Sequence, residues 1–284
     1  MSGTRTLAVP GYEILQYLGS GARSTIWQIR ERQTGRILAL KRVVKRQHSD
    51  TRFLQQAINE HDVGVNLNHP VIRRIYRMRR IRQWLSLREV HVFMEFCQGQ
   101  TVQENRPQSV REIVRIFGDV AGALAYMNAG GFVHGDIKPN NILVAPGGTV
   151  KIIDLGQSCR IGTVKDRIQG TPDFIAPEQV QRQPLDGRTD AYNFGAALYW
   201  TLTGQPIPTI LPREGSVTLV VDMTYIPPEE LNRAVPPALS KLVTDCIEVR
   251  PDHRPPMDNV AARLGLISHT MTRRQQPAEQ PEGE

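Results

Sequence analysis

The feature that most constrains this chain is the eight-residue segment HGDIKPNN, residues 134–141, with an Asp-Leu-Gly sequence beginning at Asp154 shortly after it. Chemistry at a phosphate needs a carboxylate to orient an attacking hydroxyl, a cation near the moving group and oxygen ligands for Mg²⁺. Asp136 can act as the base, and Lys138 can neutralise phosphate charge on the same side. Asn141 and Asp154 are the predicted metal ligands. The segment therefore predicts a site for phosphoryl transfer.

A glycine-containing turn between two predicted strands offers a second phosphate contact. In LGSGARSTI, residues 18–26, backbone N–H groups near Gly19 and Gly21 could approach the phosphates of a nucleotide. Ser24 stands where the G-x-G-x-x-G pattern has its third glycine, and a two-glycine hairpin alone is more often only a turn. The turn therefore indicates a nucleotide site only in combination with other residues.

Lys41 and Glu60 form a predicted pair behind this turn. Lys41 lies in an apolar strand, where an unpaired ammonium group is costly to bury, and Glu60 lies in the helix predicted next. The glutamate could hold the lysine against the α- and β-phosphates of a nucleotide. Taken alone, the two residues would be more simply explained as a surface salt bridge.

Hydrophobic periodicity divides the chain into a strand-rich and a helix-rich part, with the change near Gly99. Ser109 and Thr189 are the predicted N-caps of two long helices in the second part. The predicted elements are three strands within 12–44, a helix over 51–67, strands near 72–78 and 90–96, helices over 109–127 and 189–202, and an irregular connection with at most a short helix over 204–237.

Composition and charge narrow the class of protein. Hydrophobic residues make up 40% of the 284, enough for a buried core, and the net charge is +7. Basic residues gather at 73–88 without a base-reading motif, so a solvated basic face is favoured over a nucleic-acid site. No stretch is apolar enough for a membrane helix or a signal peptide. The three scattered cysteines fit neither a disulfide framework nor a zinc site, and we expect a soluble, cytoplasmic chain.

The order of these motifs resembles that of the eukaryotic-type protein kinases, in a bacterial style. HGD at 134–136 stands in place of H-R-D, DLG at 154–156 in place of D-F-G, and APE at 176–178 is intact. The resemblance, which covers residues 12–264, implies an α+β, bilobal protein-kinase fold with an N-terminal lobe of five antiparallel strands plus one helix and a mainly helical C-terminal lobe. The expected parts are an N-terminal arm at 1–11, the N-lobe at 12–97, the C-lobe at 98–267 and a disordered tail at 268–284.

The resemblance also implies roles for individual residues, with ATP as the phosphate donor and Mg²⁺, or Mn²⁺, as the metal. Glu95 and Cys97 would bond adenine through their backbones, and Met94 would guard the deeper pocket. The residues expected to contact the nucleotide are Leu18, Gly19, Ser20, Gly21, Ile26, Ala39, Lys41, Met94, Glu95, Cys97 and Leu143. The expected catalytic set is Asp136, Lys138, Lys41 and Glu60, with Asn141 and Asp154 as metal ligands.

Three other residues have scaffolding roles by the same resemblance. Glu178 would pair with Arg254, and Asp190, at a helix start, would hold the backbone of the catalytic loop. These contacts would shape the site without touching the reacting atoms.

The expected acceptor is a serine or threonine of a protein substrate. Lys138-Pro139 in the catalytic loop and GTP at 170–172 resemble Ser/Thr kinases rather than tyrosine kinases. Two alternatives stay open. HGD also occurs in aminoglycoside and other small-molecule kinases, although these generally lack Lys138 and the peptide platform at 170–178. The other alternative is a pseudokinase scaffold, which would have no physical need to keep the catalytic groups together.

Two departures from the family pattern bear on regulation. Gly135 replaces an arginine that reads a phosphate on the activation segment, so we expect Thr163→Ala to keep most activity. Gly64 stands where an apolar residue is usual, and the missing contact is expected to bias the Glu60 helix outward until a partner restores it. On that hypothesis Gly64→Leu raises basal activity. The sequence carries no signal for the oligomeric state or for phosphorylation at Ser158, Thr163 or Thr171.

Overall fold

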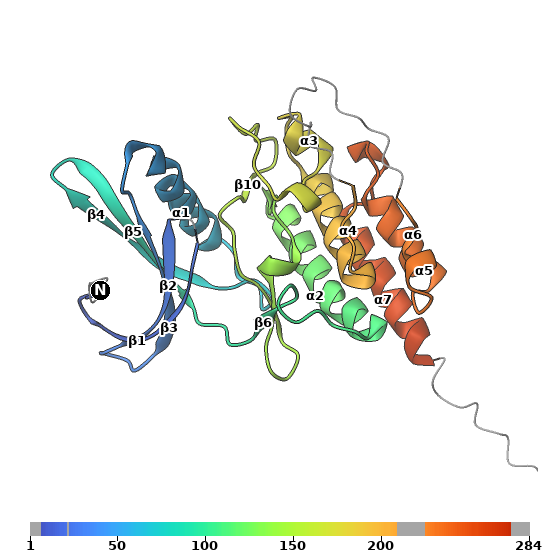
Figure 1. Cartoon of the computed structure of the whole chain (residues 1–284), viewed down its shortest axis with the longest axis horizontal. Helices are drawn as coiled ribbons and strands as arrows, with labels where there is room; N and C mark the ends of the chain where they lie inside the picture. The colour runs from blue at the N-terminus through green and yellow to red at the C-terminus, as the bar shows by residue number, and fades with distance from the viewer. Residues whose placement is uncertain (1–6, 22, 209–224, 274–284) are drawn as a thin grey trace, which may run out of the picture.

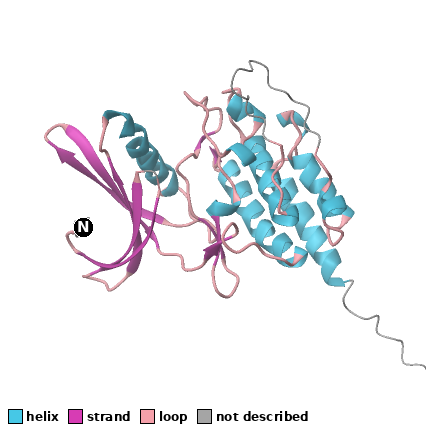
Figure 2. Cartoon of the chain, viewed as in Figure 1, coloured by secondary structure: helices cyan, strands magenta, loops and turns pink. Residues whose placement is uncertain are grey.

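The computed structural model describes residues 7–21, 23–208 and 225–273, which form two lobes (Figure 1). The N-terminal lobe is a five-stranded antiparallel sheet with one helix, α1 at Thr51–Gly64, and the C-terminal lobe is mainly helical, as predicted (Figure 2). The sheet has the order β1-β2-β3-β5-β4, with β1 at Tyr12–Ser20, β2 at Ser24–Glu31, β3 at Ile37–Val44, β4 at Ile75–Gln83 and β5 at Ser86–Glu95.

The central strands of this sheet are buried on both faces, which explains their nearly continuous apolar sequences. One face, with Ala39 and Met94, joins a core shared with α1 and the C-lobe. The other face, with Leu40 and Phe93, packs in a smaller cluster that includes Val9. The described end of the predicted N-terminal arm therefore contributes a buried side chain to the N-lobe.

The element boundaries of the N-lobe differ from the prediction at three points. Helix α1 ends at Gly64 rather than near residue 67. Strand β4 begins at Ile75 rather than at 72, because Ile72 instead forms an isolated parallel bridge with Ile152 of the C-lobe. Strands β4 and β5 form a longer hairpin than expected, joined only by Trp84 and Leu85. The many arginines of β4 obscured its strand pattern in the sequence.

The C-lobe is built around helix α4, of which nearly every side chain is buried. Small residues allow close helix packing there: a Cβ added to Gly195 would lie 2.6 Å from the Cβ of Cys246 in α6. The helices are α2 at Val110–Ala129, α3 at Pro177–Val180, α4 at Gly187–Thr203, α5 at Pro228–Leu231, α6 at Pro237–Cys246 and α7 at Met257–Arg273.

Short strands and 3₁₀ turns make up the remaining described elements. Strands β6, β8 and β9 form one small sheet, and β7 pairs with β10. The bounds are β6 at Gln100–Thr101, β7 at Phe132–Val133, β8 at Ile142–Val144, β9 at Val150–Ile152 and β10 at Cys159–Arg160, with 3₁₀ turns at His48–Asp50, Pro139–Asn141, Pro172–Phe174 and Pro251–His253.

The C-lobe differs from the prediction at the start of α4 and at the end of α7. The N-cap of α4 is Asp186, whose side chain accepts a hydrogen bond from the Arg188 N–H, so the prediction of Thr189 was wrong. Helix α7 continues to Arg273, so residues 268–273 of the predicted disordered tail are helical, and residues 274–284 lie outside the described residues. Of the irregular connection, residues 209–224 lie outside the described residues, and the rest contains the short helix α5. None of the described helices is long and apolar enough to cross a membrane.

Candidate active site

The segment 134–141 lies between β7 and β8, where the C-lobe core holds its backbone. Asp190, in the first turn of the buried helix α4, accepts hydrogen bonds from the backbone N–H groups of His134 at 3.0 Å and Gly135 at 2.8 Å. The predicted scaffolding contact of Asp190 is thus confirmed. His134 is fully buried, and burial lowers the pKa of its imidazole to about 4, so it is neutral at physiological pH.

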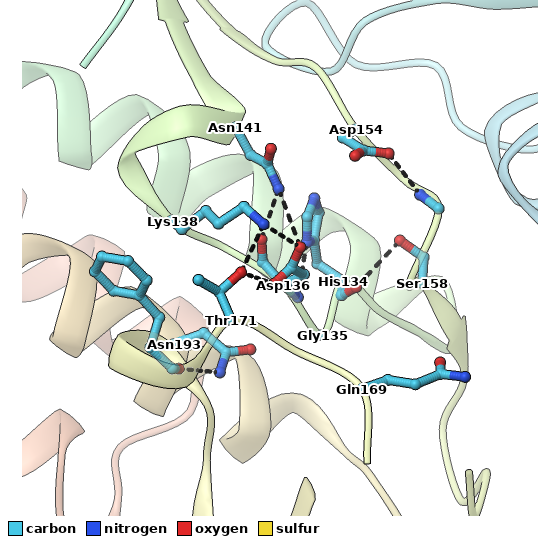
Figure 3. Close-up of polar contacts among 12 residues, drawn as sticks. His134, Gly135, Asp136, Lys138, Asn141, Asp154, Ser158, Gln169, Thr171 and Asn193 are labelled. Atoms are coloured by element: carbon cyan, nitrogen blue, oxygen red, sulfur yellow. Dashed lines mark hydrogen bonds and ion pairs between the residues drawn. The ribbon is translucent and has the colours of Figure 1, made fainter. Parts of the chain in front are cut away.

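Asp136 and Lys138 meet around the hydroxyl of Thr171 (Figure 3). The Lys138 ammonium donates to Asp136 Oδ2 at 2.8 Å and to Thr171 Oγ1 at 2.6 Å, and Thr171 Oγ1 donates to Asp136 Oδ1 at 3.0 Å. Burial raises the pKa of Asp136, and Lys138 partly offsets that rise. An acid and a cation that share one hydroxyl are arranged to orient a second hydroxyl and to balance charge beside it.

Asn141 completes this loop from the adjoining 3₁₀ turn. Its amide nitrogen donates to the backbone carbonyl of Asp136 at 2.8 Å, which fixes the loop. The amide oxygen points the other way in Figure 3. Neutral amide and carboxylate oxygens are suitable ligands for Mg²⁺, which keeps several waters and usually takes one or two protein oxygens beside phosphate oxygens. Asn141 and Asp154 fit that donor set.

Lys41, Glu60 and Asp154 come from β3, α1 and the loop after β9, and the fold brings them together. Lys41 Nζ lies 2.6 Å from Glu60 Oε2 and 3.5 Å from Asp154 Oδ1. The predicted pair is therefore a buried ion pair, not a surface salt bridge. Although burial alone would lower the pKa of Lys41, the two carboxylates raise it above its ordinary value. Burial would likewise raise the pKa of Asp154, but Lys41 and the Gly156 N–H bring it to about 2.

The strands around Lys41 place the remaining predicted nucleotide residues. In the β1–β2–β3 ladder Gly19 pairs with Ile26, and Ile26 pairs with Lys41. Ala39 pairs with the fully buried Met94 of β5. A cavity of about 210 Å³ opens beside Lys41 and is lined by Arg23, Ser24, Lys41, Val43, Phe53, Gln56, Ala57 and Asp154. Lys41 and Asp154 thus share a cavity with Ser24 of the glycine turn.

The other predicted nucleotide residues lie at the connection between the lobes and on the glycine turn. The backbone N–H of Glu95 donates to Arg74 O at 2.8 Å, and its carboxylate pairs with Lys151 at 2.8 Å. Cys97 is partly buried, and burial, followed by the nearby Glu95, raises the pKa of its thiol to about 11. Leu143, in β8, is 8% exposed. Leu18, Ser20 and Gly21 of the glycine turn are exposed.

The predicted scaffold pair in the C-lobe is also present. The Arg254 guanidinium binds both carboxylate oxygens of Glu178, at 2.7 and 2.9 Å, and both side chains are buried. Arg254 further donates to the backbone carbonyls of Arg188, Glu248 and Val249. Arg254 therefore links the short helix α3 to the start of α4 and to the segment after α6.

Comparison with known proteins agrees with the two-lobed fold and with the arrangement of the site residues. The sequence profile of the protein kinase domain matches residues 12–263. This chain belongs to the protein kinase family.

Curated relatives of this kinase domain are similar over most of its length. A probable serine/threonine-protein kinase of Clostridium acetobutylicum is 28% identical over 86% of this chain and 37% of that protein. The serine/threonine-protein kinase PknB of Mycolicibacterium smegmatis is 26% identical over 86% of the chain and 40% of its own length. PknA of Mycobacterium tuberculosis is 27% identical over 82% and 55%. The chain thus spans roughly a third to a half of these relatives.

The expectation for Gly64 is wrong for this kinase domain. A Cβ at position 64 would lie 2.3 Å from Ile75 Cγ1 and 3.3 Å from Leu155 Cδ1, so the volume is already filled. No gap is present to bias α1 outward, and Glu60 contacts Lys41. The sequence could not show this because Ile75 lies on a different element. Gly64→Leu should therefore disturb packing rather than raise basal activity.

Gly135 has a positive φ of 72°, a conformation that glycine adopts without strain. Its carbonyl accepts a hydrogen bond from Gln179 Nε2 at 2.7 Å, and the same amide group donates to Gln169 O at 3.2 Å. Asn193 of α4 donates in turn to Gln179 Oε1. Gln179, which the sequence did not single out, ties the catalytic loop to the segment after Asp154 through neutral groups.

Arg73 is a second residue that the sequence did not single out. Its guanidinium donates to the carbonyl of Ile153, directly before Asp154, and lies 3.7 Å from Glu60 Oε1. Glu60 Oε1 and Arg73 Nε are buried, and neither has a hydrogen-bond partner among the described residues. Only the arginine-rich run 73–88 could have drawn attention to this position.

Asn59, next to Glu60, ties α1 to the segment after Asp154. Its amide nitrogen donates to Ser158 O at 2.7 Å and to Gly156 O at 3.4 Å. Ser158 is itself fully buried, with its hydroxyl on His134 O at 3.3 Å. Helix α1 is thus held at its inner position by direct contacts to backbone carbonyls.

Proposed function

We propose that this chain is a serine/threonine protein kinase that transfers the γ-phosphoryl group of Mg-ATP directly to a protein hydroxyl. The observation that carries the proposal is the Asp136–Lys138–Thr171 arrangement, in which an acid and a cation already share one threonine hydroxyl. The relatives that match over most of the chain have serine/threonine-protein kinase in their names. A bound peptide would present its own serine or threonine hydroxyl to Asp136 and Lys138.

In the proposed mechanism Asp136 orients the acceptor hydroxyl and takes its proton as the new P–O bond forms. The bond between the γ-phosphorus and the bridging oxygen breaks at the same time, and ADP leaves. Lys138 stabilises the negative charge that spreads over the equatorial phosphoryl oxygens. Lys41, held by Glu60, binds the α- and β-phosphates. Asn141 and Asp154 would hold Mg²⁺, which would supply positive charge to offset the charge that develops during transfer. Positioning and charge carry the reaction, with no covalent enzyme intermediate.

The remaining nucleotide contacts belong to the same proposal. Adenine would lie against Ala39, Met94 and Leu143 and bond the backbones of Glu95 and Cys97. The glycine turn at 18–21 and Ile26 would cover the phosphates. The described cysteines are all free, which fits a reducing, cytoplasmic setting.

Phosphate transfer from labelled ATP tests the proposal. Wild type, Asp136→Asn and the surface control Asp258→Asn would each be offered casein and, separately, an aminoglycoside. We expect labelled casein from wild type and the control, and a loss of at least about a hundredfold in Asp136→Asn, since the base is removed. Labelling of the aminoglycoside alone would replace the proposal with a small-molecule kinase. Equal background from all three proteins would indicate a pseudokinase scaffold.

A further inference from the structure

The β4–β5 hairpin ends in an apolar apex that faces solvent. We call Ile81, Trp84 and Leu85 the apex. Trp84 and Leu85 are 93% and 95% exposed, and Ile81 is 39% exposed. Figure 1 shows the hairpin projecting from the end of the N-lobe that is remote from the C-lobe. Within the described ranges no segment covers these side chains, so they are open to a partner from outside.

The apex is also unfavourable for the fold itself. Gln83 pairs with Ser86, so Trp84 and Leu85 are the whole connection. Trp84 has a φ of 56°, in the left-handed region where two-residue hairpins favour Asn, Asp or Gly. A bulky aromatic residue there adds backbone strain and gains no burial in return. Its presence is therefore better explained by an interaction than by packing.

Several basic residues lie on the hairpin strands next to this apex and at the adjoining end of β3. We call Lys45, Arg46, Arg80, Arg82 and Arg88 the basic collar. None of the five forms an ion pair with a residue in the described part of the chain, and the backbone N–H of Lys45 donates to Arg88 O at 2.9 Å, which joins the end of β3 to the hairpin. Glu89, the acidic residue of the hairpin nearer to the apex in sequence, is already bound by Arg42 through two hydrogen bonds of 2.7 Å. Glu89 is therefore not free to offset the charge of the collar.

We propose that the apex and the basic collar dock this kinase domain on the surface of an anionic phospholipid bilayer. Tryptophan and aliphatic side chains enter the boundary between headgroups and acyl chains, and lysine and arginine are attracted to anionic headgroups. The apolar side chains stand at the tip of a projecting hairpin, which suits insertion into a deformable surface. A polyanion such as nucleic acid would use the collar but would leave Leu85 without a role.

This inference is independent of the proposed phosphotransfer. Lys41 of β3 contacts Asp154 of the C-lobe at 3.5 Å, so the proposed site lies where the two lobes meet. The hairpin projects from the end of the N-lobe that is remote from the C-lobe, so a docked domain would keep this site open (Figure 1). Docking would confine the enzyme and any membrane-bound substrate to one plane, which raises their effective concentration.

Vesicle flotation tests the proposal with the chain as it stands. The vesicles would be phosphatidylcholine with and without phosphatidylglycerol. The test variants are Trp84→Ser with Leu85→Ser, and separately Arg82→Ser. The matched controls are Leu266→Ser, a 70% exposed leucine on α7, and Arg233→Ser, an exposed arginine of the C-lobe. All four change surface residues, and circular dichroism would check their folding.

We expect wild type to float only with phosphatidylglycerol vesicles. The apex double variant should lose at least about tenfold in partitioning, because its insertion is removed. Arg82→Ser should lose about fivefold, the value for one basic residue near an anionic surface, and the controls should match wild type. Absence of flotation by wild type, or equal flotation by the apex variant, would overturn the proposal. Salt-sensitive binding to duplex DNA that exceeds vesicle binding would indicate a nucleic-acid surface instead.

Discussion

Two buried arginine–glutamate contacts, one in each lobe, differ in how fully their polar atoms are paired. In the C-lobe, Arg254 binds both oxygens of Glu178 and three backbone carbonyls. In the N-lobe, Arg73 lies 3.7 Å from Glu60, and a buried oxygen and a buried nitrogen of the two residues have no hydrogen-bond partner among the described residues. The first contact fixes helix α3 in the C-lobe. The second leaves two polar atoms that could form new hydrogen bonds if a ligand or a small movement of α1 brought partners within reach.

The largest expected effect is on the completed pair. Arg254→Met should lower the free energy of unfolding by about 3–5 kcal/mol, because it leaves the buried Glu178 carboxylate without its cation. Urea denaturation measures this. Arg250→Met, at an exposed ion pair nearby, is the control and should leave the midpoint nearly unchanged. Similar midpoints for both variants would mean that the C-lobe pair is not a stabilising anchor.

The pH dependence of stability provides a second test in the C-lobe, through the buried side chain of His134. Its pKa is about 4 in the folded chain and near 6.5 in the unfolded chain, so the neutral imidazole stabilises the fold above pH 6.5. That stability is lost as pH falls toward 4, by about 2 kcal/mol between pH 6.5 and 5. When both proteins are measured without metal, His134→Leu should lack the loss of stability that wild type shows between pH 6.5 and 5. The same slope in the variant and wild type would show that another group titrates there.

Arg73→Met should have a smaller effect, on activity rather than on stability. Without the guanidinium, the Ile153 carbonyl loses a hydrogen-bond donor and the Glu60 carboxylate loses a nearby cation. Asp154, which follows Ile153, and Lys41, which pairs with Glu60, are then less well positioned. We expect about a tenfold loss in kcat/KM for ATP, equivalent to roughly 1.4 kcal/mol, with partial recovery in Arg73→Lys. Steady-state kinetics with varied ATP measures it. Unchanged kinetics in Arg73→Met would make the contact incidental.

Thr163→Ala should have the smallest effect. The Thr163 hydroxyl donates to the Arg160 carbonyl at 2.7 Å, on the partly exposed segment. Gly135 cannot read a phosphate there, and Gln179 and Asn59 already hold the neighbouring backbone through neutral groups. We expect less than about a twofold change in kcat, in line with the small effect of most surface substitutions. A collapse of phosphotransfer with folding intact would show that Thr163 must be phosphorylated.

The motifs in the sequence predicted the fold and the principal ion pairs. Lys41 with Glu60, and Glu178 with Arg254, could be predicted because these residue types recur at fixed positions around a shared mechanism. The same motifs placed Asp190 beneath the catalytic loop.

The contacts of Arg73, Gln179 and Asn59 could not be predicted, since each binds a backbone carbonyl far away in sequence. Nothing about such a residue type indicates which carbonyl will be near. The β4–β5 hairpin was underestimated for a local reason, because Trp84 and Leu85 are not turn residues.

Gly64 and Ile75 occupy one volume between them, and this has an evolutionary consequence. An enlarged side chain at 64 can be accommodated only if the residue at 75 becomes smaller, and the reverse exchange is equally constrained. Substitutions at these two positions should therefore be inherited as pairs. Among related chains, glycine at the first position should accompany a β-branched or larger residue at the second, whereas leucine at the first should accompany a smaller one.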